Sequence, residues 1–151
     1  MTTNFADEER MLIDLVDKFV ENELMPLEKA VMEREAAGGE VALLPEEEAP
    51  LRAKCKELGL WALDAPEEVG GSNIRTSVML AIQERIKSTV TPFIFPPDSP
   101  NLHMMIEVAT PEQKTKYMEP YARGELRSNI AISEPGAGGD PAQMKTRAIR
   151  E

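Results

Sequence analysis

The stretch that decides the fold is Ala131–Asp140, which reads Ala-Ile-Ser-Glu-Pro-Gly-Ala-Gly-Gly-Asp. Its glycines permit positive φ and leave no side chain between the backbone amides and a flat ligand or a phosphate. A phosphate-binding P-loop would end in Gly-Lys-Ser or Gly-Lys-Thr, whereas here Gly138-Gly139 leads into Asp140-Pro141. A dinucleotide-binding Gly-x-Gly-x-x-Gly pattern would meet Pro141 at its third glycine. By itself the stretch therefore indicates a tight turn that fits neither common nucleotide template.

Helical periodicity dominates the chain before this stretch. Apolar residues recur every three or four positions in five segments, as in helices that each bury one face. The clearest start signal is Thr110-Pro111-Glu112-Gln113, a capping box with proline at the first helical position, and this last helix should bury Tyr117, Met118 and Tyr121. The expected helices run from Thr3 or Asn4 to near Pro26, through Leu51 to Gly59, from Ser72 or Asn73 to Ile86, from Ser99 to Ala109, and from Thr110 to Gly124. Residues 31–50 are expected to form a loop or a frayed connector with solvated charges.

The helical recurrence of apolar residues ends at Gly124. Residues 128–133 suit a short strand, the glycine-rich turn follows, and residues 145–151 suit a second strand. The predicted fold is mainly α: an N-terminal bundle of about five or six helices over residues 1–125, then the first strands of an incomplete β domain over residues 126–151. Two short strands cannot bury a face of their own, so we expect this chain to be the front part of a longer protein.

The bulk composition is that of an ordinary globular protein and excludes several function classes. The 151 residues are 42% hydrophobic and 29% charged, with a formal net charge of −10. Nucleic acid is not an expected partner, because phosphate binding needs clustered Lys and Arg. The single cysteine, Cys55, excludes an internal disulfide and a multi-cysteine metal site, and no metal ligand is assigned. Because the N-terminus lacks an apolar signal core and no run of about 18 apolar residues occurs, we expect no membrane span and a cytoplasmic location.

Three segments in a fixed order carry a family resemblance. Residues 131–140 have a small residue, an aliphatic residue, Ser and Glu ahead of a glycine-rich turn that ends in Asp. Residues 57–61 with 66–71, and residues 110–125, precede them in the chain. All three are similar to passages of the acyl-CoA dehydrogenases, in family order. The chain thus resembles the N-terminal helical domain and the start of the middle β domain of that family.

The resemblance implies an FAD-dependent oxidoreductase of fatty acid metabolism, which oxidises an acyl-CoA thioester across its α and β carbons. In that family the signature strand and turn lie against the flavin ring. The implied cofactor-binding residues are Ile130, Ala131, Ile132, Ser133, Gly138 and Gly139. The implied partners are the acyl-CoA substrate, an electron-transfer acceptor and further copies of the full-length protein. The family's catalytic base lies in a later helical domain, so no catalytic residue is assigned and we expect the chain to be inactive alone.

Three positions depart from the family pattern: Gly139, Ile130 and Gln143, the last of which replaces a small residue. Gly139, which the resemblance also assigns to substrate binding, replaces a hydroxyl residue that contacts the acyl-CoA in relatives. Ile130 replaces a common aromatic residue. The single histidine, His103, has no identifiable carboxylate or nucleophile partner, and we expect a packing or solvent-edge role.

Two alternatives remain open at this point. The first is a non-catalytic helical interaction module, which would complete a site only with another chain. The second keeps the fold and changes the chemistry, because acyl-CoA oxidases and flavin monooxygenases share this architecture. The missing hydroxyl at Gly139 leaves room for this second alternative.

Overall fold

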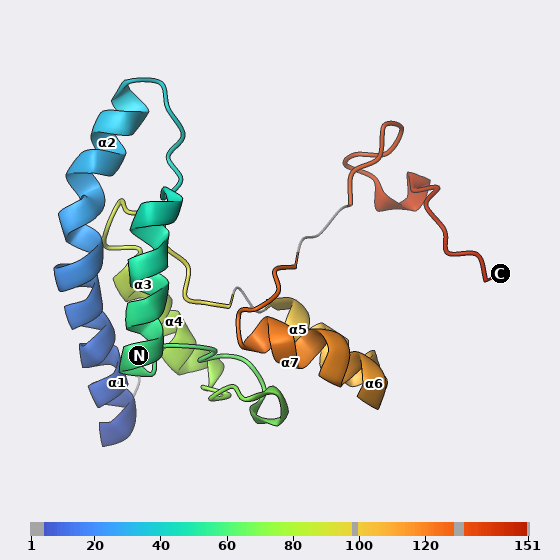
Figure 1. Cartoon of the computed structure of the whole chain (residues 1–151), viewed down its shortest axis with the longest axis horizontal. Coiled ribbons are helices and arrows are strands. Elements are labelled where there is room, and N and C mark those ends of the chain that lie inside the picture. The colour runs from blue at the N-terminus through green and yellow to red at the C-terminus, as the bar shows by residue number, and fades with distance from the viewer. Residues whose placement is uncertain (1–4, 98–99, 129–131, 151) are drawn as a thin grey trace.

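The computed structural model describes residues 5–97, 100–128 and 132–150. It is mainly helical, as predicted, with α1 to α4 in one group and α5 to α7 beside it (Figure 1). The C-terminal segment lies beyond the second group. The elements are α1 (Asp7–Phe19), η1 (Val20–Leu24), η2 (Met25–Leu27), α2 (Glu28–Ala36), α3 (Pro45–Leu58), η3 (Glu67–Val69), α4 (Thr76–Ile86), α5 (Pro100–Val108), α6 (Pro111–Gln113), η4 (Lys114–Met118), α7 (Glu119–Ala122) and η5 (Pro141–Gln143).

The first helix is longer than the sequence predicts. It passes through Pro26 as one rod made of α1, η1, η2 and α2, so the loop expected from residue 31 begins only after α2. Proline lacks a backbone N–H, but the helical ladder is already re-spaced here, because the Met25 N–H donates to the Val20 carbonyl in a π-helical turn. The Thr91 hydroxyl, from a distant part of the chain, donates to the Leu24 carbonyl at 2.8 Å. This long-range bond helps the rod to continue.

Helix α3 starts at Pro45, inside the stretch expected to be a loop. Leu44 is its extended N-cap residue, and the Leu44 N–H donates to the Glu47 carboxylate at 2.8 Å. The acidic run 46–48 therefore lies in the first helical turn, where negative charge offsets the helix dipole. The expectation of solvated charges holds for the exposed Glu46 and fails for Glu47, which is largely covered and paired with Arg34. Gly59 ends the helix at a φ of 71°, as predicted.

Helix α4 starts at Thr76, after the predicted caps Ser72 and Asn73. The amides of residues 72–74 are already used, because they donate to the carbonyls of residues 62, 65 and 63 at 2.8 to 3.0 Å. A cap residue needs an extended backbone and a free N–H two or three residues later, but Asn73 has a φ of +47° and the Ile74 N–H, which a Ser72 cap would accept, is already donated to the Leu63 carbonyl. The tertiary contact therefore delays the helix.

The capping box at Thr110 forms as predicted. The Thr110 N–H donates to the Gln113 side chain at 2.8 Å, and the Gln113 N–H donates to Thr110 Oγ1 at 3.3 Å. Met118 and Tyr121 are buried, but Tyr117 is 46% exposed, against the prediction. The π-helical spacing of η4 changes which side chains face the core, and a period of 3.6 does not describe that turn.

A three-ring cluster forms the centre of the first helix group. The centre of the Phe19 ring in α1 lies 5.5 Å from that of Phe93 and 5.6 Å from that of Phe95. The ring centres of Phe93 and Phe95 are 5.7 Å apart, in an edge-to-face arrangement. Such aromatic pairs contribute about 0.5–1.5 kcal/mol beyond the area that they bury. The proline-rich crossing 91–97 thus carries part of the core, with its odd-numbered residues buried up to Phe95.

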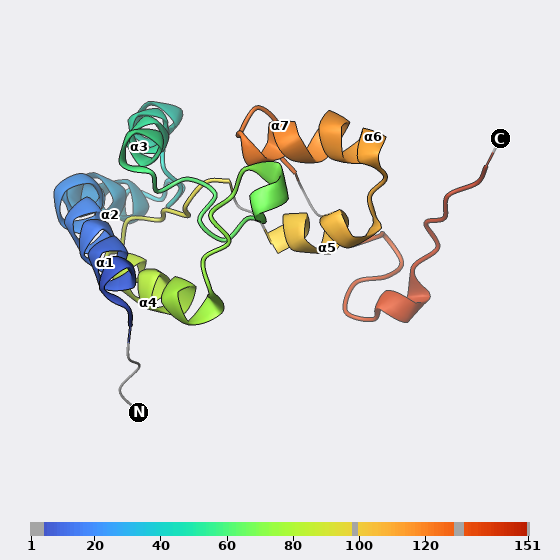
Figure 2. The ribbon, with the colours of Figure 1, turned by 90° about the horizontal axis from the view of Figure 1, so that it is seen from below.

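Trp61 joins the two helix groups. It packs against both hydrophobic clusters, the one around Phe19 and the one formed by Leu102, Met118 and Tyr121. Its indole N–H donates to the Ala122 carbonyl at 2.7 Å. Figure 2 shows α5 lying beside the run from α6 to α7, which makes the second group.

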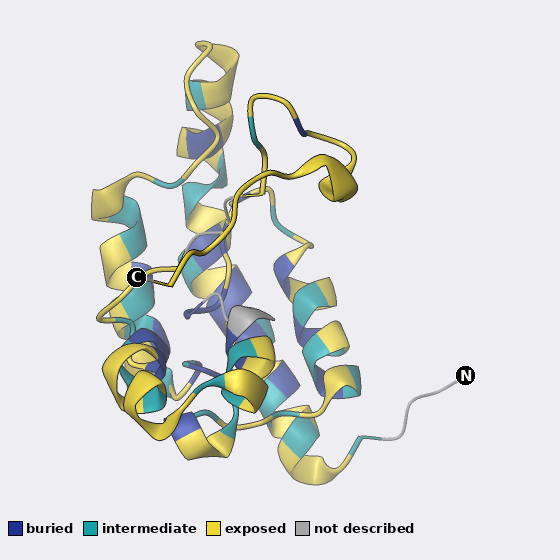
Figure 3. Cartoon of the chain, turned by 90° about the vertical axis from the view of Figure 1, so that its right-hand side faces the viewer, coloured by how far each residue is buried: buried dark blue, intermediate teal, exposed yellow. Residues whose placement is uncertain are grey.

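The segment 132–150 contains no strand. It holds an isolated bridge between Glu134 and Ala137 and the short turn η5, and most of it is exposed (Figure 3). The strands expected at 128–133 and 145–151 are therefore not formed within the described residues. A strand needs a neighbour to pair its backbone N–H and C=O groups, and none lies beside this segment in the described part of the chain. The division into domains at residue 125 stays a prediction.

Candidate functional site

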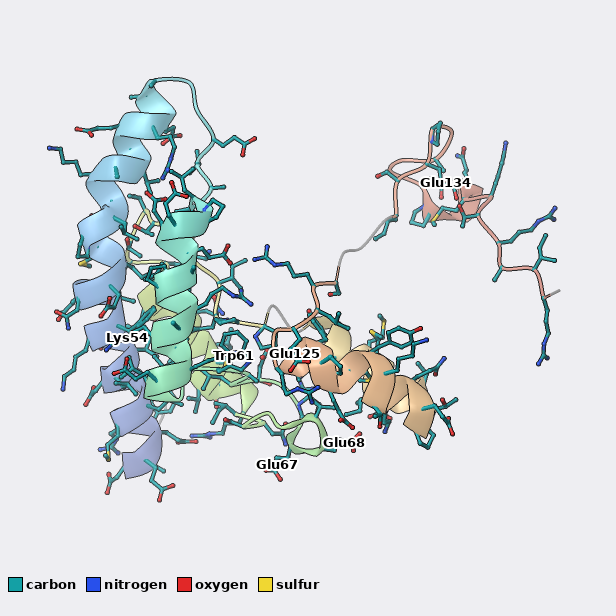
Figure 4. All side chains as sticks on the ribbon, in the orientation of Figure 1. Lys54, Trp61, Glu67, Glu68, Glu125 and Glu134 are labelled. Carbon is teal, nitrogen blue, oxygen red and sulfur yellow. The ribbon has the colours of Figure 1, made fainter. Side chains whose placement is uncertain are left out.

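The glycine-rich segment closes on itself as a small loop. The Glu134 carboxylate accepts from the N–H groups of Lys145 and Thr146, both at 2.8 Å, and Asp140 accepts from the Ala142 N–H at 3.0 Å. Figure 4 shows Glu134 on this loop, away from α1 to α4. The hydrogen bonds from Thr146 and Lys145 hold the pKa of Glu134 below its ordinary value. A carboxylate of this kind is a weak base, and its geometry serves to close the loop.

The predicted cofactor-binding residues fall into two sets. Ile130 and Ala131 lie outside the described residues, whereas Ile132, Ser133, Gly138 and Gly139 are described and exposed. A Cβ added at Gly138 or Gly139 would meet no atom within 4 Å. Among the described residues, the amides of these two glycines have no hydrogen-bond acceptor. The loop therefore presents bare backbone and one hydroxyl to its surroundings.

A cavity of about 400 Å³ lies between the two helix groups. It is bounded by the loop before α3, the start of α3, the proline-rich crossing and the residues that follow α7. We call it the Arg127 cavity; its lining residues are Ala42, Leu43, Glu48, Arg52, Pro92, Phe93, Ile94, Pro97, Tyr121, Leu126, Arg127 and Ser128. The volume is within the range of small-molecule sites, roughly 300–1,000 Å³.

Two arginines share one carboxylate at the rim of this cavity. Arg52 Nη1 lies 3.3 Å from Glu48 Oε1, and Arg127 Nη2 lies 3.7 Å from Glu48 Oε2. The Arg52 guanidinium also lies 5.1 Å from the centre of the Trp61 ring, which restricts its motion. The Arg127 side chain is 76% exposed. The cavity therefore combines an apolar interior with an excess of one positive charge among the charged side chains that line it.

The other side chains with possible catalytic chemistry, His103 and Cys55, make only structural contacts among the described residues. His103 Nε2 lies 2.5 Å from the Asp64 carbonyl, in keeping with the packing role expected for it. Cys55 is fully buried, and burial raises the pKa of its thiol to about 12. Within the described ranges, no group of three or more His, Cys, Asp or Glu side chains is placed to hold a metal ion. None of the helices described has the length and apolarity needed to cross a membrane.

Residues 6–125 match the family model for the N-terminal domain of acyl-CoA dehydrogenases. The chain belongs to the acyl-CoA dehydrogenase family. It is 37% identical to the (R)-benzylsuccinyl-CoA dehydrogenase of Thauera aromatica over an alignment that covers all of this chain and 39% of that protein. It is 26% identical to subunit CarC of the caffeyl-CoA reductase-Etf complex of Acetobacterium woodii, covering 96% of this chain and 37% of that protein.

The fold agrees with this assignment. A solved structure of a candidate acyl-CoA dehydrogenase from Mycobacterium abscessus superposes with a TM-score of 0.74 at 27% identity, covering 94% of this chain and 38% of that one. The chain thus spans less than two fifths of the length of these relatives.

Sequence reasoning missed the Arg127 cavity. The spacing of Glu48 and Arg52 on one helix face is a usable signal for an ion pair. No local signal brings the proline-rich crossing near residues 126–128, because these segments lie far apart in the chain and line one cavity only in the folded structure. Conversely, the described signature residues Ile132, Ser133, Gly138 and Gly139 lie after α7, outside both helix groups (Figure 1).

Proposed function

We propose that this chain supplies the helical domain and the flavin-facing edge of an FAD-dependent acyl-CoA dehydrogenase, which oxidises an acyl-CoA thioester between its α and β carbons. The observation that carries the proposal is the exposed signature loop, with its bare glycine amides and the Ser133 hydroxyl, placed directly after a helical domain of this family. In this proposal the chain contributes no catalytic base.

The signature residues suit a flat cofactor with a polar edge. The hydroxyl of the exposed Ser133 is a hydrogen-bond donor, and so are the amides of Gly138 and Gly139, which have no acceptor among the described residues. The two glycines carry no side chain that would block a ring. When bound, FAD would accept the hydride from the β carbon. Donors fixed at the edge of the ring would stabilise the negative charge that develops there. Ile130, Ala131 and Ile132 would form the strand that continues this edge, and Gly139 would also lie near the CoA chain.

The substrate and partners follow from the relatives and remain part of the proposal. One relative is named for benzylsuccinyl-CoA and another as a 3-(aryl)acrylate reductase, which favours an acyl group with an aromatic substituent. CarC is named as a subunit of an Etf complex, which supports an electron-transfer flavoprotein as the acceptor. A homo-oligomer in a cytoplasmic setting completes the proposal.

The test is the product of the uninterrupted reading frame that contains residues 1–151. We expect the purified protein to carry FAD, to lose flavin absorbance near 450 nm on addition of its acyl-CoA under exclusion of oxygen, and to turn over with an artificial electron acceptor. A colourless product that binds no FAD would contradict the proposal and favour an interaction module. Bleaching followed by rapid reoxidation in air, with H₂O₂ formed, would favour an acyl-CoA oxidase.

The role of Ser133 has its own matched test. We expect Ser133→Ala to weaken FAD binding or slow flavin reduction, and Ser133→Thr to restore it, because both Ser and Thr place a hydroxyl on Cβ. Exposed Ser88, whose hydroxyl donates to the Arg85 carbonyl at 2.7 Å, supplies the control substitution Ser88→Ala. Equal flavin content and reduction rates in all three variants would remove Ser133 from the flavin site.

A further inference from the structure

We propose that the Arg127 cavity binds a small organic acid that has an apolar body, with the acid's carboxylate held by Arg127 and Arg52. The proposal comes from the shape and charge of the cavity. Its ligand chemistry does not depend on the proposed function, but assigning the ligand as the acyl end of a substrate rests on it.

The interior of the cavity is apolar. Phe93 and Tyr121 line it and are only 4% and 7% exposed. Ile94 and Leu126 also line the cavity and are 59% and 43% exposed, which leaves apolar area for a ligand to cover. A volume of about 400 Å³ admits a ligand the size of a substituted phenyl ring, not an extended peptide.

The charged part of the cavity is incomplete. Glu48 supplies one carboxylate for two guanidinium groups, and its contact with Arg127 is long, at 3.7 Å. A guanidinium group presents several N–H donors in a plane and prefers a carboxylate in a two-bond arrangement. Arg52 is already oriented by Glu48 and by the Trp61 ring. A second carboxylate placed between the arginines would complete a network of two positive and two negative groups.

The same features argue against other anions. A free phosphate would gain nothing from the apolar walls, and a nucleotide would bring a multiply charged phosphate to a lining that holds only one net positive charge and the Glu48 carboxylate. An uncharged aromatic molecule would leave the arginines unsatisfied by a second anion. The combination of an apolar body and one carboxylate is the chemistry that uses both halves of the cavity.

The binding test uses the 151-residue chain labelled with ¹⁵N and the probe 3-phenylpropanoate. We expect saturable changes in the amide signals of Ile94, Leu126 and Arg127, and binding of the neutral isostere 3-phenylpropanamide that is weaker by roughly tenfold or more, because a charge-assisted bond to arginine is lost. Equal affinities for the acid and the amide would overturn the proposal, as would signal changes that avoid these three residues.

Matched variants separate this site from general charge effects. Arg127→Ala should weaken 3-phenylpropanoate binding by roughly tenfold, and the fold should persist because the side chain is 76% exposed. Arg123→Ala removes an equally positive charge from a nearby side chain that pairs with Glu119 and Glu125 outside the cavity lining, and it should leave the affinity within about twofold. Ile94→Asp should also weaken binding by roughly tenfold or more, because it places an anion on the apolar wall. Equal effects of Arg127→Ala and Arg123→Ala would overturn the proposal.

A second arm identifies the source of the acid. In the product of the uninterrupted reading frame, Arg127→Ala should raise the KM roughly tenfold for an acyl-CoA whose acyl group carries a free carboxylate, if the acyl end occupies the cavity, and it should change the KM little for an uncharged analogue. Unchanged KM values for both thioesters, together with lost 3-phenylpropanoate binding, would assign the cavity to a free acid. If that protein holds no flavin, the proposed function fails while the binding result on the chain still decides this inference.

Discussion

Gly124→Ala offers a sharp test of how the two helix groups are joined. Gly124 follows α7 with a φ of +76°, and a Cβ built on it would lie 2.3 Å from Cζ2 and 2.8 Å from Cη2 of Trp61. Ordinary contacts of a Cβ are 3.4 to 4 Å. The Trp61 ring cannot move away freely, because its N–H donates to the Ala122 carbonyl and Lys56 Nζ lies 4.3 Å from the ring centre.

The expected cost has two parts. An alanine in the left-handed region costs roughly 1–2 kcal/mol. Forcing a methyl group against a packed ring costs about 1–3 kcal/mol more. The free energy of unfolding should therefore fall by about 2–5 kcal/mol. Gly59→Ala is the matched control, because Gly59 has a φ of +71° and a Cβ there would meet nothing within 4 Å. Gly59→Ala should therefore lower the free energy of unfolding only by the cost of the left-handed conformation, roughly 1–2 kcal/mol.

The assay is urea unfolding followed by far-UV circular dichroism and, where Trp61 is present, by fluorescence, since Trp61 is the single tryptophan of the chain. Phenylalanine lacks the outer indole ring, so in a Trp61→Phe background the extra cost of Gly124→Ala over Gly59→Ala should disappear. Equal costs for both glycine variants in the wild-type background would refute this account. So would an extra cost that persists after Trp61→Phe.

Three further predictions concern pH and capping. Burial raises the pKa of the Cys55 thiol from 9.0 to about 12, so between these pH values the unfolded state loses a proton that the folded state keeps, and the free energy of unfolding should fall by about 1.4 kcal/mol per pH unit. Urea titrations at pH 7 and pH 10 measure this slope, and Cys55→Ala should remove it. The Leu44 N–H and then Arg34 lower the pKa of Glu47, so its stabilisation is present above its ordinary pKa and is lost as pH falls; Glu47→Gln should reduce the drop in Tm between pH 7 and pH 3, and an unchanged drop would count against this. Thr110→Ala should cost about 1 kcal/mol in thermal unfolding, whereas a neutral effect would mean that the capping box contributes nothing.

The helical character of the chain could be predicted because it depends on local signals. The capping box at Thr110 and the stop at Gly59 are decided within a few residues, and the structure confirms both. The family could also be recognised, because the ordered segments from residue 57 to residue 140 are properties of the linear chain. Tyr117 was placed wrongly, because the π-helical turn around it is not visible in a 3.6-residue period.

Local sequence signals determined that the chain is mainly helical, that α3 ends at Gly59, that a helix begins after Thr110 and that a glycine-rich turn follows the helices, since propensity, capping and φ preferences act between near neighbours. Only the tertiary structure decided that the rod continues through Pro26, that α4 begins late and that Arg52 and Arg127 share Glu48. Each of these results depends on hydrogen bonds or charges brought together from distant segments. The candidate cavity belongs to this second class, because a pocket is a property of packed elements and no single element contains it.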